Sequence, residues 1–379
     1  MSQQAASTEQ HQSLQRKKPP FRADQVGSLL RSEPVKKARL QKAAGDITAE
    51  QLRQIENDEI IRIVKKQKET GIKVVTDGEF RRAWWHFDFL ENLDGVEGFK
   101  PESGIQFHNV KTKPRGIKVT GDIDFTNHPM LEDYKFLHSI AGDATPKMTI
   151  PSPNMLFFRG KVEKDSYQND YEAFQHDLSL AYKKAIQAFY DAGCRYLQLD
   201  DTAWAVFLSE QGKKQIEAFG KTPDELRQLF AKSINDAVAD RPDDLTVTMH
   251  ICRGNFQSTW TAEGGYDAAA ETIFDGLNLD GLFLEYDDSR SGGFEPLRYV
   301  KRPDLQLVLG LVTSKYGELE NPDDIKRRIE EASRYVSLNQ LSLSPQCGFA
   351  STEEGNLLTE EQQWAKLRHV VEIAKDVWK

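Results

Sequence analysis

Residues 246–252, with the sequence TVTMHIC, indicate the fold more clearly than any other stretch of the chain. They are mostly apolar or β-branched and show no clean polar alternation, which is typical of a strand buried on both faces. The stretch nevertheless ends in two reactive side chains, His250 and Cys252. Seven similar runs occur elsewhere, at Gln25–Leu30, Lys73–Glu79, Lys147–Pro153, Tyr196–Asp201, Gly281–Asp287, Leu305–Val312 and Leu341–Cys347.

Helical patterns separate these apolar runs. Two of them open with a capping residue, a proline and early acids, at Thr222–Glu225 and Asn321–Asp324. Strands that alternate with helices predict βα units and a parallel sheet, and eight such units favour a closed barrel over an open sheet. We therefore predict an α/β fold, a (β/α)8 TIM barrel. The clearest helical patterns are Tyr171–Ala192, Pro223–Ala239, Asp323–Val336 and Glu360–Trp378.

Two connections are longer than a minimal barrel requires. Pro34–Gly71 predicts two helices that are split near Gly45. Trp84–Pro146, between the second and third strands, shows no second long helical pattern. Its aromatic start and the β-like alternation over Lys111–Phe125 predict an inserted hairpin and loops over one mouth of the barrel.

The composition excludes several functional classes. The 379 residues include 50 Lys and Arg against 59 Asp and Glu, and the net charge of −9 argues against a nucleic-acid-binding protein. No run approaches the ~18 consecutive apolar residues of a membrane span, so no membrane partner is expected. Three cysteines are too few for a disulfide scaffold and favour a reducing, cytoplasmic location. The composition says nothing about oligomeric state.

The domain organisation predicted from the sequence is simple. Residues 1–20 are polar and lack the apolar core of a secretory signal, so we predict a disordered tail there. No internal repeat or Gly/Ser linker divides the rest of the chain. We therefore predict a single barrel domain at 21–379, with the insertion at about 84–146.

Polar side chains cluster where the predicted strands end, and in a barrel these ends meet at the face that carries the active site. His250 and Cys252 are two residues apart on one strand, so their side chains leave on the same side. With Glu285 and Cys347, which end two other strands, they form a donor set that suits Zn²⁺. The alternative is that these are scattered buried residues, because free cysteine is often a small core residue. Cys194 lies at a strand start, and we assign it to packing.

This ligand set would limit the chemistry of the metal. Two thiolates and a carboxylate make Zn²⁺ a poor Lewis acid for water, but the ion can still bind a thiol and lower its pKa. That chemistry leads to alkyl transfer to sulfur. Glu79 and Asp200 would place negative charge at the mouth for an ammonium group, and the backbone at Gly27–Ser28 could hold a carboxylate. Together these features describe a thiol amino acid as substrate.

Six short motifs in order resemble the catalytic C-terminal barrel of cobalamin-independent methionine synthase, and more closely its short, stand-alone relatives. The resemblance covers Phe21 to the end of the chain. It rests most specifically on the His-x-Cys, Glu and Cys order. The motifs are Val26-Gly27-Ser28-Leu29, Asp77-Gly78-Glu79, Leu197-Gln198-Leu199-Asp200, Met249-His250-Ile251-Cys252, Leu284-Glu285 and Pro345-Gln346-Cys347-Gly348.

The resemblance implies a zinc-dependent methyltransferase on a (β/α)8 barrel. It would move a methyl group from a methyltetrahydropteroyl(poly)glutamate or a similar donor to homocysteine, forming methionine. It also implies roles for individual residues. The zinc ligands would be His250, Cys252, Glu285 and Cys347, the carboxylate site Val26 and Ser28, and the amino-group site Glu79 and Asp200.

The sequence departs from the family pattern on the methyl-donor side. Pro151–Asn154 stands where the family has a tryptophan, and Thr313-Ser314-Lys315 stands where it has a proton-donating histidine. Candidate proton donors are Lys315, Asp201 and His86. Two other functions stay open: zinc-dependent alkyl transfer to a different thiol, as in enzymes that open epoxides, and a non-catalytic zinc- or thiol-binding protein.

Overall fold

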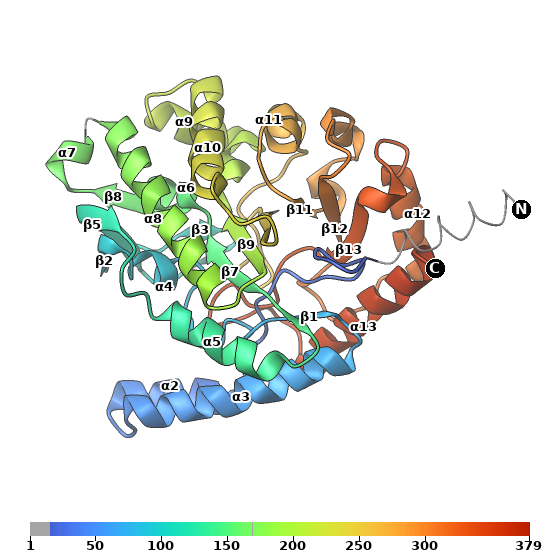
Figure 1. The fold of residues 1–379 in the computed structure, drawn as a ribbon, viewed down its shortest axis with the longest axis horizontal. Coiled ribbons are helices and arrows are strands. Elements are labelled where there is room, and N and C mark those ends of the chain that lie inside the picture. Colours follow the sequence, from blue (N-terminus) through green and yellow to red (C-terminus); the bar gives the residue numbers. More distant parts are fainter. Residues whose placement is uncertain (1–15, 169) are drawn as a thin grey trace, which may run out of the picture.

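The computed structural model describes residues 16–168 and 170–379, and its centre is a parallel sheet of six strands. The strand order is β13-β12-β11-β10-β9-β7, so these strands lie side by side in chain order; β8 (Gly160–Val162), between β7 and β9 in the chain, belongs to another sheet. Figure 1 shows these strands at the centre and helices outside them. The strands are β7 (Met148–Pro151), β9 (Tyr196–Asp201), β10 (Thr246–Ile251), β11 (Gly281–Glu285), β12 (Gln306–Val312) and β13 (Leu341–Pro345).

The remaining predicted strands close this sheet into a ring. β1 (Val74–Val75) pairs in parallel with β6 (Thr145–Pro146), which lies one residue before β7. On the other side, Ala23 forms a parallel bridge with Leu343 of β13. The Leu29 N–H then donates to the Gly78 carbonyl at 3.0 Å, which joins the first run to the second. The predicted (β/α)8 barrel is confirmed.

The first predicted strand, Gln25–Leu30, is not a regular strand, and that part of the prediction is wrong. Side chains bind two of its carbonyls: Thr76 Oγ1 donates to Gly27 O at 2.6 Å, and Gln198 Nε2 donates to Val26 O at 2.8 Å. Gly27 also has a φ of +144°, outside the range of a strand. These side-chain bonds replace the ladder that the apolar pattern predicted.

The helices match the patterns read from the sequence, and Pro34–Gly71 contains two of them, as predicted. Thr48, Thr222 and Thr359 each form a reciprocal capping box with the residue three positions later. The long helices are α2 (Glu33–Ala44), α3 (Ala49–Glu69), α8 (Tyr171–Asp191), α10 (Pro223–Val238), α12 (Pro322–Ala332) and α13 (Glu360–Val377). Short helices are α4 (Phe87–Leu90), α6 (Pro153–Arg159), α7 (Asp165–Gln168), α9 (Glu210–Ala218) and α11 (Ala270–Asp275).

The segment predicted as an insertion does contain antiparallel strands. β2 (Asp94–Phe99) pairs with β5 (Gly116–Asp124), and a small hairpin joins β3 (Gln106–Phe107) to β4 (Val110–Lys111). One helix, α5 (Met130–Ala141), follows these strands, and the prediction of a hairpin and loops did not include it. Its buried residues Met130, Tyr134, Leu137 and Ala141 have helical spacing.

The N-terminal residues are described only from Arg16 onward, so most of the predicted tail lies outside the described residues. Arg16 Nη1 donates to Gln306 Oε1 at the start of β12, and Pro20 is buried. Within the described residues, every helix is too short or too polar to cross a bilayer. The core consists of two buried clusters, and the larger joins strand residues such as Leu199 and Val247 to residues of the outer helices.

Candidate active site

Four potential metal ligands meet at the carboxyl ends of the strands. His250 lies on β10, Cys252 follows directly after it, Glu285 ends β11, and Cys347 follows β13. One ligand atom from each residue lies within 4.8 Å of the others, and all four residues are buried. The sulfurs of Cys252 and Cys347 are 3.6 Å apart. The structure thus brings together the whole set that the sequence proposed.

The cluster fits a tetrahedral metal ion. Both ring nitrogens of His250 and Oε2 of Glu285 are buried without a hydrogen-bond partner, which is costly unless another ligand satisfies them. Two sulfurs bound at about 2.3 Å to one tetrahedral ion would lie about 3.8 Å apart, close to the observed separation. One nitrogen, two sulfurs and one oxygen are donors that Zn²⁺ accepts.

The loop after β10 holds two of these ligands in place. The Arg253 N–H donates to Glu285 Oε1 at 2.9 Å, and the Gly254 N–H donates to Cys252 Sγ at 3.3 Å. Gly254 has a φ of +88°, and a Cβ there would lie 2.5 Å from Thr261 Oγ1. Glycine is therefore required for the backbone to approach the sulfur.

Two carboxylates predicted to hold an ammonium group line a pocket that also exposes His250, Cys252 and Cys347 of the cluster. Glu79 Oε1 accepts a hydrogen bond from Thr149 Oγ1 at 2.9 Å and lies 3.4 Å from Arg82 Nη1, whereas its Oε2 is buried without a partner. Asp200 Oδ1 accepts from Gln198 Nε2 at 2.7 Å. Burial raises the pKa of Asp200 to about 7, although nearby His250 opposes this shift. Hydrogen bonds therefore fix both acids, and Glu79 keeps one buried oxygen without a partner.

A buried polar network orients Asp200. Lys147 Nζ contacts Asp24 Oδ1 at 3.2 Å and donates to Gln198 Oε1 at 2.9 Å. This bond fixes which way the Gln198 amide points, so its Nε2 can serve both Asp200 and the Val26 carbonyl. The interior of the barrel thus sets the geometry of two predicted substrate positions.

Ser28 and Val26, the predicted carboxylate site, also line the pocket. Gly348 packs so closely that a Cβ there would lie 1.9 Å from Ser28 Oγ. The Phe349 N–H donates to the Ser28 carbonyl at 2.9 Å. These contacts join the first run to the loop of Cys347, so any residue larger than glycine at 348 would displace Ser28.

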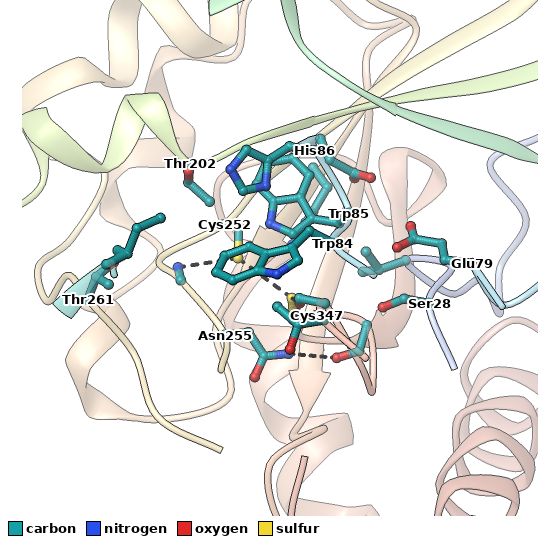
Figure 2. Close-up of a pocket in the computed structure, with 18 of the residues that line it drawn as sticks. Ser28, Glu79, Trp84, Trp85, His86, Thr202, Cys252, Asn255, Thr261 and Cys347 are labelled. Carbon is teal, nitrogen blue, oxygen red and sulfur yellow. Dashed lines mark hydrogen bonds between the residues drawn. The ribbon is translucent and has the colours of Figure 1, made fainter. Parts of the chain in front are cut away.

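An open pocket lies over the cluster. In Figure 2, Ser28 and Glu79 lie on one side of the cysteine pair, and Thr202 and Thr261 lie on the other. Trp84, Trp85 and His86 supply aromatic rings to the wall, together with Phe107 of the hairpin. The insertion therefore contributes directly to the pocket.

The three candidate proton donors lie in different surroundings. Lys315 does not line the pocket; its Nζ donates to Asp287 Oδ2 at 2.9 Å, and both side chains are buried. Asp201 also lies outside the pocket lining, because its oxygens accept bonds from Ser152, Asn154 and two backbone N–H groups. His86 alone of the three lines the pocket, and both of its ring nitrogens lack a partner.

Several pocket residues were missed by the sequence analysis. Arg159 ends α6 and lines the pocket, and Asn255 Nδ2 donates to the Gly348 carbonyl at 2.8 Å. The usable signal was position: Arg159 follows two aromatic residues shortly after a strand end, and Asn255 lies three residues after Cys252. Thr202, Thr261 and Ser351 gave no comparable signal.

The profile of the family described as "Cobalamin-independent synthase, Catalytic domain" matches residues 21–376. The chain belongs to this family. This match covers the barrel and every residue of the site, and it confirms the resemblance that the ordered motifs indicated.

Close relatives are known by sequence and by structure. The chain is 90% identical to the uncharacterized protein YxjG of Bacillus subtilis (strain 168) and 72% identical to YxjH of the same strain, each over the full length of both proteins. It resembles the crystal structure of a candidate vitamin-B12-independent methionine synthase from Listeria monocytogenes. That comparison has a TM-score of 0.81 and 51% identity and covers 96% of this chain and 100% of the Listeria chain.

Proposed function

We propose that the protein is a zinc-dependent S-methyltransferase that moves a methyl group from a methyltetrahydropteroyl(poly)glutamate or a similar donor to homocysteine, forming methionine. The observation that carries the proposal is the buried cluster of His250, Cys252, Glu285 and Cys347, of which the histidine and both cysteines line the pocket. The family membership and the name of the Listeria relative support the same reaction.

The four residues of the cluster would hold the zinc ion. When bound, zinc would lower the pKa of the substrate thiol and keep its sulfur a nucleophilic thiolate. Glu285 is suited to give way to that sulfur, because only its Oε1 is held by the backbone and its Oε2 has no protein partner.

The pocket walls would orient the amino-acid end of homocysteine. Glu79 and Asp200 would bind the ammonium group, and the segment at Val26–Ser28 would bind the carboxylate. Two carboxylates with one cation give charge-assisted bonds, which are stronger than neutral ones. With the ammonium and the carboxylate held, the thiol at the other end of the molecule would be directed toward the cluster, which supplies the proximity that methyl transfer needs.

The donor would enter from the open side, beside the aromatic wall. Rings of Trp84 and Trp85 offer flat surfaces on which a pterin can stack. His86 is neutral, because burial and the nearby cations Arg159 and Arg115 lower its pKa well below the usual range. The His86 N–H would therefore orient the methyl donor by hydrogen bonding. A neutral His86 would not serve as the acid that protonates the donor's leaving nitrogen.

A thiol panel tests this proposal against its alternatives. Purified, zinc-loaded protein is given homocysteine, cysteine or 2-mercaptoethanesulfonate with each methyl donor, and thioether products are measured. We expect methionine only, with slow or undetectable turnover on a monoglutamate donor and faster turnover on a polyglutamate or a more activated donor. Alkylation of another thiol would favour the alternative transferase. Tight thiol binding without any thioether would favour a binding protein.

A further inference from the structure

Arg159 is partly exposed, and it differs from the buried arginines near the barrel mouth. Arg31, Arg82 and Arg253 each donate to several backbone carbonyls or carboxylates. Arg159 forms no ion pair with any residue in the described part of the chain, and its Nε is shielded from water without a hydrogen-bond partner. Leaving a guanidinium donor unmet in this way is costly, so a structural role does not explain it.

The environment of Arg159 leaves its charge uncompensated. Burial lowers the pKa of Arg159 to about 10, and no carboxylate acts on it in the opposite direction. A pKa of about 10 still leaves the side chain positively charged at neutral pH. Its Cζ lies 4.7 Å from the ring centre of Phe158. An anion brought by a ligand would complete this environment.

The chemistry of the pocket divides into two halves. The acids Glu79 and Asp200 line it where the amino acid is expected, and Ser28 lies with Glu79 on one side of the cysteines (Figure 2). Arg159 lines the same pocket with aromatic rings and the unpartnered His86. A flat ligand with a carboxylate matches that set, because a guanidinium binds a carboxylate through two parallel hydrogen bonds.

We propose that Arg159 determines specificity for the methyl donor by binding a carboxylate of a flat, aromatic donor at the mouth of the pocket. This inference rests on the proposed function, since it names the group that the donor must carry. It gives a role to the one pocket cation that neither the metal cluster nor the amino-acid site uses. The aromatic wall would hold the ring of the donor, and Arg159 would bind the donor's carboxylate.

The test compares donors with and without a carboxylate. Binding of 5-methyltetrahydropteroyltriglutamate and of a 5-methyltetrahydropterin that lacks the benzoylglutamate is measured by calorimetry on the zinc-loaded protein. We expect Arg159→Met to weaken binding of the triglutamate about tenfold or more and to leave binding of the bare pterin unchanged. Arg159→Lys should lose less affinity for the triglutamate, because lysine keeps the positive charge but cannot form the two parallel hydrogen bonds.

Arg115→Met is the matched control. Arg115 also lies near His86, but Asp88 and Glu91 pair with it at 2.9 and 2.7 Å, and it does not line the pocket. The Arg115→Met substitution should leave the affinity for both donors unchanged. Zinc content and homocysteine binding, measured on every variant, report whether the fold and the other half of the site are intact.

Three results would overturn the inference: equal weakening of both donors by Arg159→Met, no weakening of either, or a wild-type protein that binds no carboxylate-bearing donor. A separate result would overturn the proposed function instead. If the wild-type protein binds the triglutamate through Arg159 but forms no methionine, the binding role stands and the methyl transfer does not.

Discussion

Residues of the same type have different roles in this protein, and their surroundings decide which role each one has. Cys252 and Cys347 face each other across 3.6 Å in the cluster, whereas the Cys194 thiol donates to the Tyr196 carbonyl at 3.3 Å at the opposite end of a strand. Burial raises the pKa of Cys194 to about 11, so it stays a thiol at neutral pH. The same type of side chain would therefore be a metal ligand at the proposed zinc site, whereas at Cys194 it packs in the core.

The cysteines give the first prediction. Cys347→Ala or Cys252→Ala should lose bound zinc and activity together, because each removes a charged ligand from a set of four. Elemental analysis of the purified proteins measures the zinc. Cys194→Ala is the control and should keep one zinc per chain. Stoichiometric zinc in Cys347→Ala would show that the ligand assignment is wrong.

The amino-group site gives the second prediction. Asp200→Asn and Glu79→Gln keep the shape of each side chain but remove a charge that homocysteine's ammonium would meet. Each should weaken homocysteine binding by about 1.5–3 kcal/mol, or about tenfold or more, as measured by calorimetry. Zinc content should not change. If neither substitution alters homocysteine affinity, the ammonium group binds elsewhere.

Convergence of the ligands could be predicted at the residue scale because it depends only on strand order and on the ends of strands. Arg159 gave only a positional signal, because its place in the pocket depends on how α6 turns after β7. Asp201 shows the opposite case. It directly follows Asp200 in the sequence, yet Ser152 and Asn154 bind it outside the pocket. Alternation along a strand separates such neighbours, and only the final packing shows what each one meets.

At the scale of elements, helices were easier to predict than strands. The caps at Thr222 and Thr359 mark helix starts through local hydrogen bonds, which the sequence displays directly. The Gln25–Leu30 run failed because its carbonyls bind side chains from distant segments, which no local pattern reveals. α5 was missed because the antiparallel strands before it dominate the pattern of that segment.

Helix α13 gives the third prediction. The Gln362 N–H donates to Thr359 Oγ1 at 3.2 Å, and the Thr359 N–H donates to Gln362 Oε1 at 2.9 Å. Thr359→Ala removes the first bond and should lower the free energy of unfolding by about 1 kcal/mol, seen as a lower urea midpoint. Thr359→Ser keeps the hydroxyl and should behave like the wild type. An unchanged midpoint in Thr359→Ala would mean that the cap does not contribute.

At the scale of the whole molecule, the cluster ties together strands that are distant in sequence. Cys252 and Cys347 are 95 residues apart, and the first run packs against the loop of Cys347 through Gly348. A bound metal would therefore stabilise the ring of strands as well as serve catalysis. We also propose that residues 21–379 unfold as one unit, as the absence of a linker in the sequence suggests.

Zinc removal gives the fourth prediction. Ligand binding to the folded state alone contributes about 4 kcal/mol at a thousandfold excess over the dissociation constant. Treatment with a chelator should thus lower the melting temperature by on the order of 5–10 °C in a single transition. Cys252→Ala should melt at the lower temperature with or without chelator. A chelator effect of the same size in that variant would place the stabilising metal elsewhere.

The central claim is that the thiol of homocysteine is activated at this cluster, and X-ray absorption at the zinc edge tests it most directly. The protein alone should show two sulfur ligands, from Cys252 and Cys347, with the remaining ligands nitrogen or oxygen. Addition of homocysteine should raise the number of sulfur ligands to three. A spectrum that keeps two sulfur ligands at saturating homocysteine would contradict the account.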